Sequence, residues 1–493
     1  MIKINLKYIF IILINLITCG YLFNPEHIGL SGSGSTAYND FNSLNPATIS
    51  KHKGLSIQVF SGNFGFGNNF LSISDYNDIN GSNFDDSEST NYYPKSEVML
   101  LFDDGIGLNG QLSFSMPFSN IIYNNFSFSA KTYFWVDANL PRSIIDLTLY
   151  GNQFDKQYKL NVDGSMNLIN EFSFGYGNYN NLFSYGIKIK YLQGIASSRL
   201  KNISENSSYF STDSLGFLGK AEYLRNQQIG GSSIAFDIGL VANESINGWY
   251  FGFSLNNLFA KIKWDKNNFT YNYLKNSVVE KLPLRFNEKQ YIAINLDTLN
   301  AINMINIPAN EIFQIENFKV IELENLENIE FIDIYFNEIG DTIYASEYGK
   351  IIETNYNSFL IESSNIPDNI LDTLDANFKT NITEYPISFN IGSHKEIDEN
   401  VTLTIDLSTG FNNSIKNSEN WKLSTGLIFN RFKNIPLTFG LSFGGKDKIN
   451  SGFSFGYNRG PFKINYGIGT RYGIFLPSWR GLDFSFSINF KIN

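Results

Sequence analysis

The chain has 493 residues, of which 43% are hydrophobic, 16% aromatic and 17% charged, and its formal net charge is −10. With a mean hydropathy of −0.16, this composition excludes a bundle of membrane-spanning helices and argues against a charge-rich disordered chain. No basic stripe is available to neutralise phosphates, so nucleic acid is not an expected partner.

The N-terminus has the features of an export signal. Lys3 and Lys7 precede the apolar run Ile9–Thr18, which is too short to span a bilayer, since a helical span needs about 20 apolar residues. We therefore expect residues 1–20 to be a cleavable signal peptide. Cys19 is either an ordinary residue near the cleavage site or a lipid-acceptor cysteine. It is the only cysteine, so no disulfide framework or thiolate metal site is expected.

Residues 21–50 form a segment of small and polar residues. Their composition predicts neither a membrane strand nor an independent core. The stretch Gly29–Ser35 resembles a phosphate-binding loop only in composition, because no G-K-[ST] follows it. For this stretch we expect a flexible structure.

Alternation of apolar and polar residues dominates residues 51–281 and 386–493. The last run is typical, with Leu482, Phe484, Phe486, Ile488, Phe490 and Ile492 alternating with polar residues. Because successive side chains of a strand point to opposite faces, each such strand has one apolar and one polar face.

Two β architectures would give this alternation, a soluble sandwich and an outer-membrane barrel. The runs are about 9–11 residues long, as expected for tilted membrane strands. Their apolar positions are mostly Phe and Tyr, and the opposite positions are Gly, Ser, Thr and Asn. These features favour the barrel, whose aromatic side chains face lipid and whose small side chains face the lumen. We predict an all-β, transmembrane antiparallel barrel of about 14 strands, since even numbers are usual.

Two short stretches do not have the pattern of wall strands. Ser96–Asp104 and Arg142–Leu149 carry apolar residues at helical spacing. They predict short helices, at a barrel end or in the lumen.

Residues 282–385 form a long acidic insertion. Between Asp297 and Glu384 there are 17 acidic residues and three lysines. Strand-like pieces at Ile329–Phe336 and Thr342–Ala345 and an amphipathic helix at Pro367–Phe378 are expected. The insertion is a loop, a cap domain or a plug. Its carboxylates are of the type that binds calcium, but without a D-x-D-x-D-G loop a solvated acidic surface is the better interpretation.

Motifs for catalysis or metal binding are weak. Residues 452–456 match G-x-S-x-G but lie within a predicted strand, where the alternation explains them. His27, His52 and His394 are isolated from one another, so no zinc-ligand spacing exists. We expect no catalytic residues, no metal site and no cofactor.

Four charged residues occupy positions opposite the apolar faces: Lys188, Lys190, Asp237 and Asp406. A charge facing lipid near the midplane costs about 2–4 kcal/mol, so these side chains are predicted to point into the lumen. They either bind or filter solutes or form inter-strand salt bridges that fill the interior.

Several stretches resemble the FadL-like superfamily of long-chain fatty-acid transporters. Asn45, Pro46 and Ala47 resemble its N-terminal NPA segment. Further stretches resemble strands of Bacteroidota members, namely residues 185–195, 234–240, 253–258 and 437–445. The chain is most similar to a Bacteroidota family of outer-membrane barrels of unknown function, and more distantly to the PorV secretion-associated barrel.

This resemblance implies a 14-stranded barrel in the outer membrane of a Gram-negative-type bacterium. Residues 21–50 would be a lumenal hatch, with Asn45, Pro46 and Ala47 in its final turn. The implied function is passive transport of small hydrophobic compounds through a wall opening, with outer-membrane lipids and a hydrophobic ligand as partners. The alternative is a non-conducting interaction or secretion scaffold that binds partner proteins through the acidic insertion. The transport hypothesis predicts an apolar pocket between hatch and wall.

Overall fold

The computed structural model describes most of the barrel and part of the insertion. The described residues are 24–38, 44–153, 156–213, 216–273, 382–410, 420–432 and 434–492, together with short strands between 282 and 363. The predicted signal peptide, Cys19 and the predicted helix Pro367–Phe378 lie outside the described residues. No described helix is both long and apolar enough to cross a membrane.

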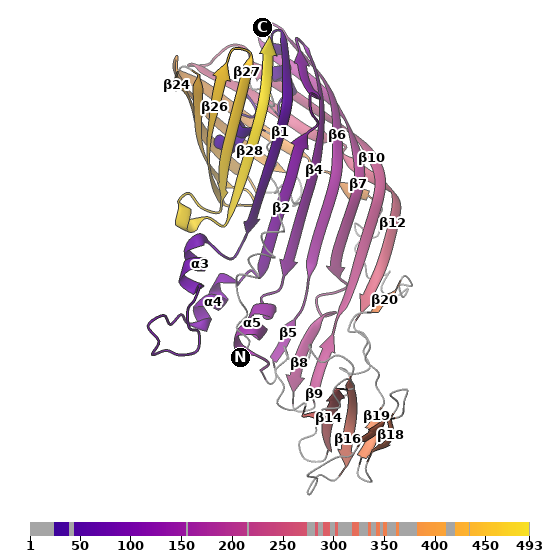
Figure 1. Cartoon of the computed structure of the whole chain (residues 1–493). Coiled ribbons are helices and arrows are strands. Elements are labelled where there is room, and N and C mark those ends of the chain that lie inside the picture. The colour runs from indigo at the N-terminus through magenta and orange to yellow at the C-terminus, as the bar shows by residue number, and fades with distance from the viewer. Residues whose placement is uncertain are drawn as a thin grey trace.

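A closed antiparallel barrel of 14 strands forms the body of the molecule, as predicted (Figure 1). The first and last strands pair from Leu55↔Ile492 to Gly67↔Gly481 and close the wall. In order around the barrel the strands are β1 (Leu55–Asn68), β2 (Ile106–Ser115), β4 (Phe126–Leu140), β6 (Asp163–Tyr179), β7 (Phe183–Asn202), β10 (Glu222–Ala242), β11 (Trp249–Leu258), β22 (Ser388–Asp398), β23 (Val401–Gly410), β24 (Lys422–Phe432), β25 (Ile435–Gly444), β26 (Ile449–Arg459), β27 (Phe462–Arg471) and β28 (Gly481–Ile492).

Three of these wall positions are built from interrupted strands. β3 (Asn120–Tyr123) continues β2, and β12 (Lys261–Tyr273) continues β11. β20 (Ile361–Ser363) and β21 (Ile382–Glu384) pair with β12 on the line of β22. Pro117 and Pro386 lie in two of the breaks, where the missing N–H of proline ends a hydrogen-bond ladder.

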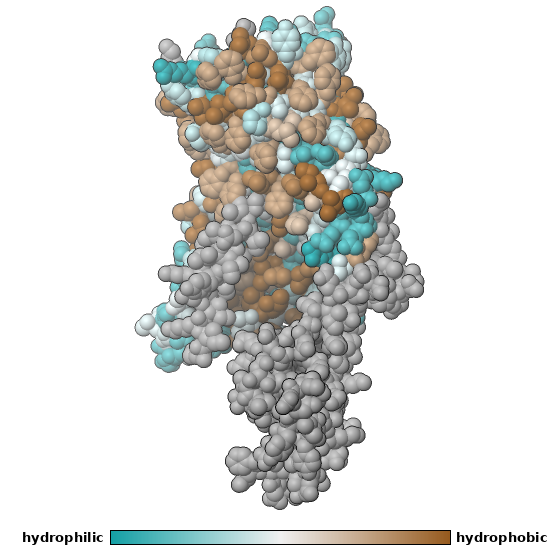
Figure 2. All heavy atoms as spheres, turned by 45° about the vertical axis from the view of Figure 1, so that its right-hand side comes forward, coloured by the Kyte–Doolittle hydropathy of each residue, from teal (hydrophilic) through white to brown (hydrophobic). Residues whose placement is uncertain are grey.

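The two faces of the wall have opposite polarity, as the alternation predicts. Phe484 on the outer face is 40% exposed, whereas Ser485 and Ser487 on the inner face are 6% and 0% exposed. Figure 2 shows brown and tan apolar residues over much of the barrel surface in that view, with polar residues at its upper rim. Such a band fits a hydrocarbon environment, and the small inner residues leave space in the lumen.

The polarity of the wall inverts along β12. The inner residues Ala260, Ile262 and Trp264 are at most 2% exposed, whereas Lys261 and Lys263 are exposed on the outer face. Asn257 and Phe259 have positive φ values of 60° and 64° and rotate the strand at this point. The inversion marks where the wall leaves its apolar outer band.

The two ends of the barrel differ. At one end short turns join the strands, such as Asn124–Asn125 and Gly460–Pro461. The other end carries the long connections, and we call it the long-loop end. Its helices are α3 (Ile73–Ile79), α4 (Lys95–Leu101) and α5 (Ser143–Tyr150). The last two match the predicted short helices, whereas α3 was not predicted.

Small sheets extend beyond the long-loop end (Figure 1). One contains β5 (Lys156–Lys159), β8 (Tyr209–Asp213), β9 (Gly216–Lys220) and β13 (Leu282–Pro283). Within the insertion, one sheet contains β14 (Lys289–Asn295), β15 (Ala301–Asn303), β16 (Phe318–Glu324) and β19 (Gly349–Ile352), and β17 (Ile334–Phe336) pairs with β18 (Thr342–Ala345). Both predicted strand-like pieces overlap this hairpin. The wall resumes at β21, inside the range 282–385 expected for the insertion.

The assignment of residues to the inner and outer faces of the wall predicts how a charged substitution on β26 affects folding of the barrel. Phe455 is 41% exposed on the outer face, and Asn450 lines a polar cavity inside. Phe455→Arg should lower the folded fraction strongly, because an outward Arg costs about 2–4 kcal/mol near a bilayer midplane. Asn450→Arg should fold like the parent chain. Migration in SDS gels with and without boiling measures this, and equal folding of the two variants would contradict the assignment.

Candidate functional site: the plugged lumen

The described N-terminal residues, 24–38 and 44–52, lie inside the barrel, and we call them the lumenal segment. They contain the helix α2 (Pro25–Gly29), which packs on β26 and β27, and the 3-10 helix η1 (Pro46–Lys51), which packs on β6, β7 and β10. The expectation of a flexible Gly29–Ser35 stretch is wrong, because Ser33 and Ser35 are buried against the wall.

Both short helices of the lumenal segment begin with Asn-Pro. Asn24 and Asn45 are the N-caps, and each side chain accepts a hydrogen bond from the N–H two residues later, at 3.2 Å and 3.0 Å. The proline that follows has no N–H to leave unpaired and has a fixed φ suited to the first helical position. Asn45, Pro46 and Ala47 therefore form the start of the turn that leads into β1.

The inner wall is made of glycine where the lumenal segment passes. A Cβ added to Gly440 would lie 2.1 Å from the carbonyl carbon of Leu30, and one added to Gly452 would lie 1.9 Å from the oxygen of Ile28. Any side chain at these positions would overlap the segment. We call the set the glycine track. It consists of Gly175, Gly177, Gly186, Gly239, Gly252, Gly392, Gly426, Gly440, Gly452 and Gly467, each of which has an atom of the segment within 3 Å of its added Cβ.

The glycine track is continuous across neighbouring strands because the register pairs its members. Gly440 pairs with both Gly426 and Gly452, and Gly186 pairs with both Gly177 and Gly239. The segment therefore runs around the inside of the wall from β27 through β26, β25 and β24 to β22, and on through β11, β10 and β7 to β6.

Asp406 anchors the middle of the lumenal segment. Its two carboxylate oxygens accept hydrogen bonds from Gly34 N at 2.9 Å, Thr36 N at 3.0 Å and Ser35 Oγ at 3.1 Å. Asp406 is 3% exposed and faces the lumen on β23. Hydrogen bonds to a charged group contribute about 1.5–3 kcal/mol each, so this residue is a principal attachment of the segment.

Asn45 anchors the segment a second time. Its Nδ2 donates to Thr36 O at 2.8 Å, to Leu240 O at 3.0 Å and to Phe253 O at 3.1 Å. One side chain thus joins both halves of the segment to β10 and β11. Its bonds to Leu240 and Phe253, with the cap on Ala47, give the predicted hatch motif a geometric role.

Lys190 and Asp237 form a buried ion pair inside the wall, 2.7 Å apart. Asn257 accepts from Lys190 at 2.8 Å, and its own N–H donates to Asp237 at 2.8 Å. Because Asn257 has a positive φ, this network fixes the rotated backbone before β12. Lys188 stands opposite Asp237 in the register. The geometry supports a structural role for this pair more than a solute-filtering one.

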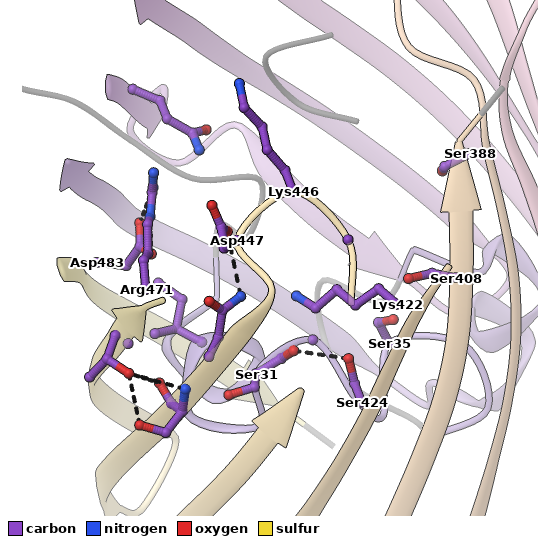
Figure 3. A pocket seen from close by; sticks show the side chains of 18 of the residues that line it. Ser31, Ser35, Ser388, Ser408, Lys422, Ser424, Lys446, Asp447, Arg471 and Asp483 are labelled. Carbon is purple, nitrogen blue, oxygen red and sulfur yellow. Dashed lines mark hydrogen bonds and ion pairs between the residues drawn. The ribbon is translucent and has the colours of Figure 1, made fainter. Parts of the chain in front are cut away.

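A polar cavity of about 210 Å³ lies on the long-loop side of the lumenal segment, and we call it the chamber (Figure 3). Ile28, Ser31, Gly32 and Ser35 form its floor. Its walls come from β1, β2, β22 to β24 and β26 to β28 and from the turn before β26. They carry amides, hydroxyls and charged groups, including Asn63, Asn109, Asn390, Ser408, Lys422, Ser424, Lys446, Asp447, Arg471 and Asp483. This lining differs from the apolar pocket expected between hatch and wall.

An apolar cluster covers a different part of the inner wall. Trp135, Trp264, Ile262 and Tyr385 pack together with Ile169, Leu192, Ala235 and Ala260 on β4 to β12. Trp264 Nε1 donates to Thr383 at 2.8 Å, which satisfies its only polar atom. In the part of the chain that the structure describes, no three His, Cys, Asp or Glu side chains gather as a metal site.

Sequence reasoning missed several residues of these sites. Glu171 lies 3.9 Å from Lys190 and shares the inner face of Ser173, so the alternation could have identified it. Lys422 lies at the first position of β24, where strand bounds are least predictable. No signal in the sequence links Asp406 to Gly34, because the contact joins residues far apart in the chain.

The glycine track predicts that one methyl group will displace the segment. Gly440→Ala should leave the barrel folded but expose the lumenal segment to protease, because the new Cβ overlaps Leu30. Gly164→Ala is the matched control, since its Cβ would come no closer than 3.4 Å to any neighbour. Limited proteolysis of both folded variants measures the difference, and equal protection would show that the segment does not lie on Gly440.

The seating of the segment should also depend on pH. Burial lowers the pKa of His27 from 6.5 to about 4, while Glu26 opposes the shift. A released His27 takes up a proton between these values, so its contribution to the stability of the seated state is full above about pH 6.5 and is lost as the pH falls through about 4. Protease exposure of the segment should rise on acidification and should rise less in His27→Gln. Identical pH profiles would contradict this role of His27.

No protein-family model matches the sequence, and no curated protein matches it significantly. Among solved structures, the toluene transporter TbuX of Ralstonia pickettii is similar at 9% identity and a TM-score of 0.46, over 97% of this chain and 100% of that one. A FadL homologue of Pseudomonas aeruginosa is similar at 11% and 0.45, over 97% and 100%. The toluene transporter TodX of Pseudomonas putida is similar at 10% and 0.42, over 96% and 98%. A Bacteroidota origin and a relation to PorV stay predictions.

Proposed function

We propose that this chain is an outer-membrane barrel that transports small compounds passively and is closed at rest by its lumenal segment. The apolar outer band supports a position in lipid, with outer-membrane lipids as its surroundings. Short turns at one end and long connections at the other are the usual asymmetry of outer-membrane barrels, whose long loops face outward.

The observation that carries the proposal is how the segment is held. It touches the wall through the glycine track, through polar anchors such as Asp406 and Asn45, and through only a few buried apolar side chains such as Leu30 and Ile49. Polar contacts exchange with water at a modest net cost. The wall itself is a closed hydrogen-bonded ladder. The segment can therefore leave its seat while the barrel stays intact.

Small hydrophobic compounds are the solute class that the resemblance in the sequence implies, and we retain it in the proposal. The apolar inner cluster around Trp135, Trp264 and Tyr385 supports it, since aromatic side chains offer a surface for an apolar solute. The scaffold alternative depends on the acidic insertion, whose side chains lie almost wholly outside the described residues, and it stays a prediction.

Deleting Gly29–Ala47 tests the plug directly. The variant should still show heat-modifiable folding, and its single-channel conductance in planar bilayers should rise at least about tenfold, as for a 14-stranded pore without its plug. The control deletes residues 85–90 in the exposed α3–α4 connection and should leave the conductance low.

The same proteins test the solute class in whole cells. Uptake of the hydrophobic probe N-phenyl-1-naphthylamine should be faster with the wild-type barrel than with no barrel, and faster still with the deletion. A folded deletion variant with wild-type conductance would reject the plug. If the conductance of the deletion variant rises as expected but the probe is not taken up, only the assignment of hydrophobic compounds as the solute class would be rejected.

A further inference from the structure

We propose that the chamber is a binding site for a small hydrophilic oxyanion, a carboxylate or a phosphate, with Lys422 as its cationic anchor. The site is separate from the apolar inner cluster, and its binding chemistry does not depend on the transport proposal.

Two of the three cations that line the chamber are held in ion pairs, and Lys422 is the third. Arg471 donates from Nε and Nη2 to Asp483 at 2.8 Å and 2.6 Å. Lys446 pairs with Asp137 at 3.1 Å. Lys422 has no ion pair or hydrogen bond to any residue of the described ranges, although it is only partly exposed. A sheltered ammonium without a partner is costly, so an anion that occupies the chamber would be stabilised there.

The position of the Lys422 ammonium is favourable for a ligand. Figure 3 shows its side chain reaching across the chamber above the lumenal segment. A Cβ added to Gly32 would lie 3.5 Å from its Nζ, so the ammonium stands over the floor of the chamber, where a ligand would rest.

Ser31 provides a second, independent donor in the same cavity. It lines the chamber, is 6% exposed, and its Oγ has no hydrogen-bond partner. Its backbone is held in place, because Ser424 donates to Ser31 O at 3.1 Å. A buried hydroxyl normally finds a partner, and an oxyanion bound to Lys422 would supply an acceptor. One ammonium and one free hydroxyl match the oxygens of a carboxylate or phosphate.

The size and charge of the chamber limit the ligand. At about 210 Å³ it lies below the ~300 Å³ at which pockets for drug-sized ligands begin. Its lining contains three cations and two carboxylates. Arg471 is neutralised by Asp483 and Lys446 by Asp137, so Lys422 and Asp447 are the charged groups of the lining without an ion pair among the described residues. Asp447 is the internal competitor for Lys422, and in the structure it instead accepts from Asn450 at 3.4 Å.

Ligand-observed saturation-transfer NMR on the full-length barrel in detergent tests the site. The probes are acetate and methylphosphonate, with acetamide as the uncharged counterpart of acetate. We expect saturable transfer to at least one anion and none to acetamide. The anion that binds more tightly then decides between carboxylate and phosphate chemistry. Transfer to neither anion, or transfer to acetamide equal to that of the anion that binds, would overturn the proposal before any variant is made.

Variants locate the anion within the chamber. Lys422→Gln should weaken binding at least about tenfold, the effect of losing a charge-assisted hydrogen bond, and Lys422→Arg should restore it to within about threefold. Lys261→Gln is the matched control, because it removes an ion-paired lysine, 2.9 Å from Glu384, that lies outside the chamber, and it should leave affinity unchanged. Asp447→Asn should strengthen binding.

The outcomes separate this site from the transport proposal. Unchanged affinity in Lys422→Gln, or an equal loss in Lys261→Gln, would overturn the anion site. Anion binding is measured with the segment in place, so it does not depend on conductance. If the Gly29–Ala47 deletion leaves the conductance unchanged while anion binding still depends on Lys422, only the proposal that the segment closes the pore would be rejected.

Discussion

The close approach of the lumenal segment to the inner wall is the constraint on which the rest of the structure depends. Backbone atoms of residues near Leu30 and Pro46 lie where the Cβ atoms of wall residues would be. Only glycine leaves that space, and the antiparallel register aligns glycines of neighbouring strands into a path. The glycines of the track therefore have a local reason, which is to let one chain segment lie flat inside a closed sheet.

From this constraint follow the polarity and the arrangement of the interior. Because the wall has no side chains along the track, the apolar side chains of the segment meet little apolar surface there, and polar groups provide its specific attachments. Asp406 receives three donors from it, and Asn45 joins its two halves to the wall. The seated segment in turn forms the floor of the chamber and brings the free Ser31 hydroxyl near Lys422. Plug and binding surface are thus parts of one structure.

Local sequence patterns predicted the strands of the wall. The contacts of the lumenal segment could not be predicted in this way, because they join residues far apart in the chain. The period-2 alternation gives the inner and outer faces, because it depends on strand geometry alone. The number of strands is harder to read, since β11 and β12 form one wall position across a rotated backbone at Asn257 and Phe259. Asp406 was expected to face the lumen, but its partners Gly34 and Thr36 are some 370 residues away in the chain. The flexible segment expected at Gly29–Ser35 is ordered because the wall supplies contacts that its own sequence lacks.

The central claim is that the segment lies in the lumen against a defined part of the wall. A disulfide tests it most directly at Ser33 and Thr404, whose hydroxyl oxygens are 2.7 Å apart. In a Cys19→Ser background, the double substitution Ser33→Cys and Thr404→Cys should cross-link spontaneously in the assembled barrel, because paired cysteines need close Cβ atoms. Ser33→Cys with Thr425→Cys on the outer face should not. Absence of the first cross-link, or equal formation of both, would contradict the account.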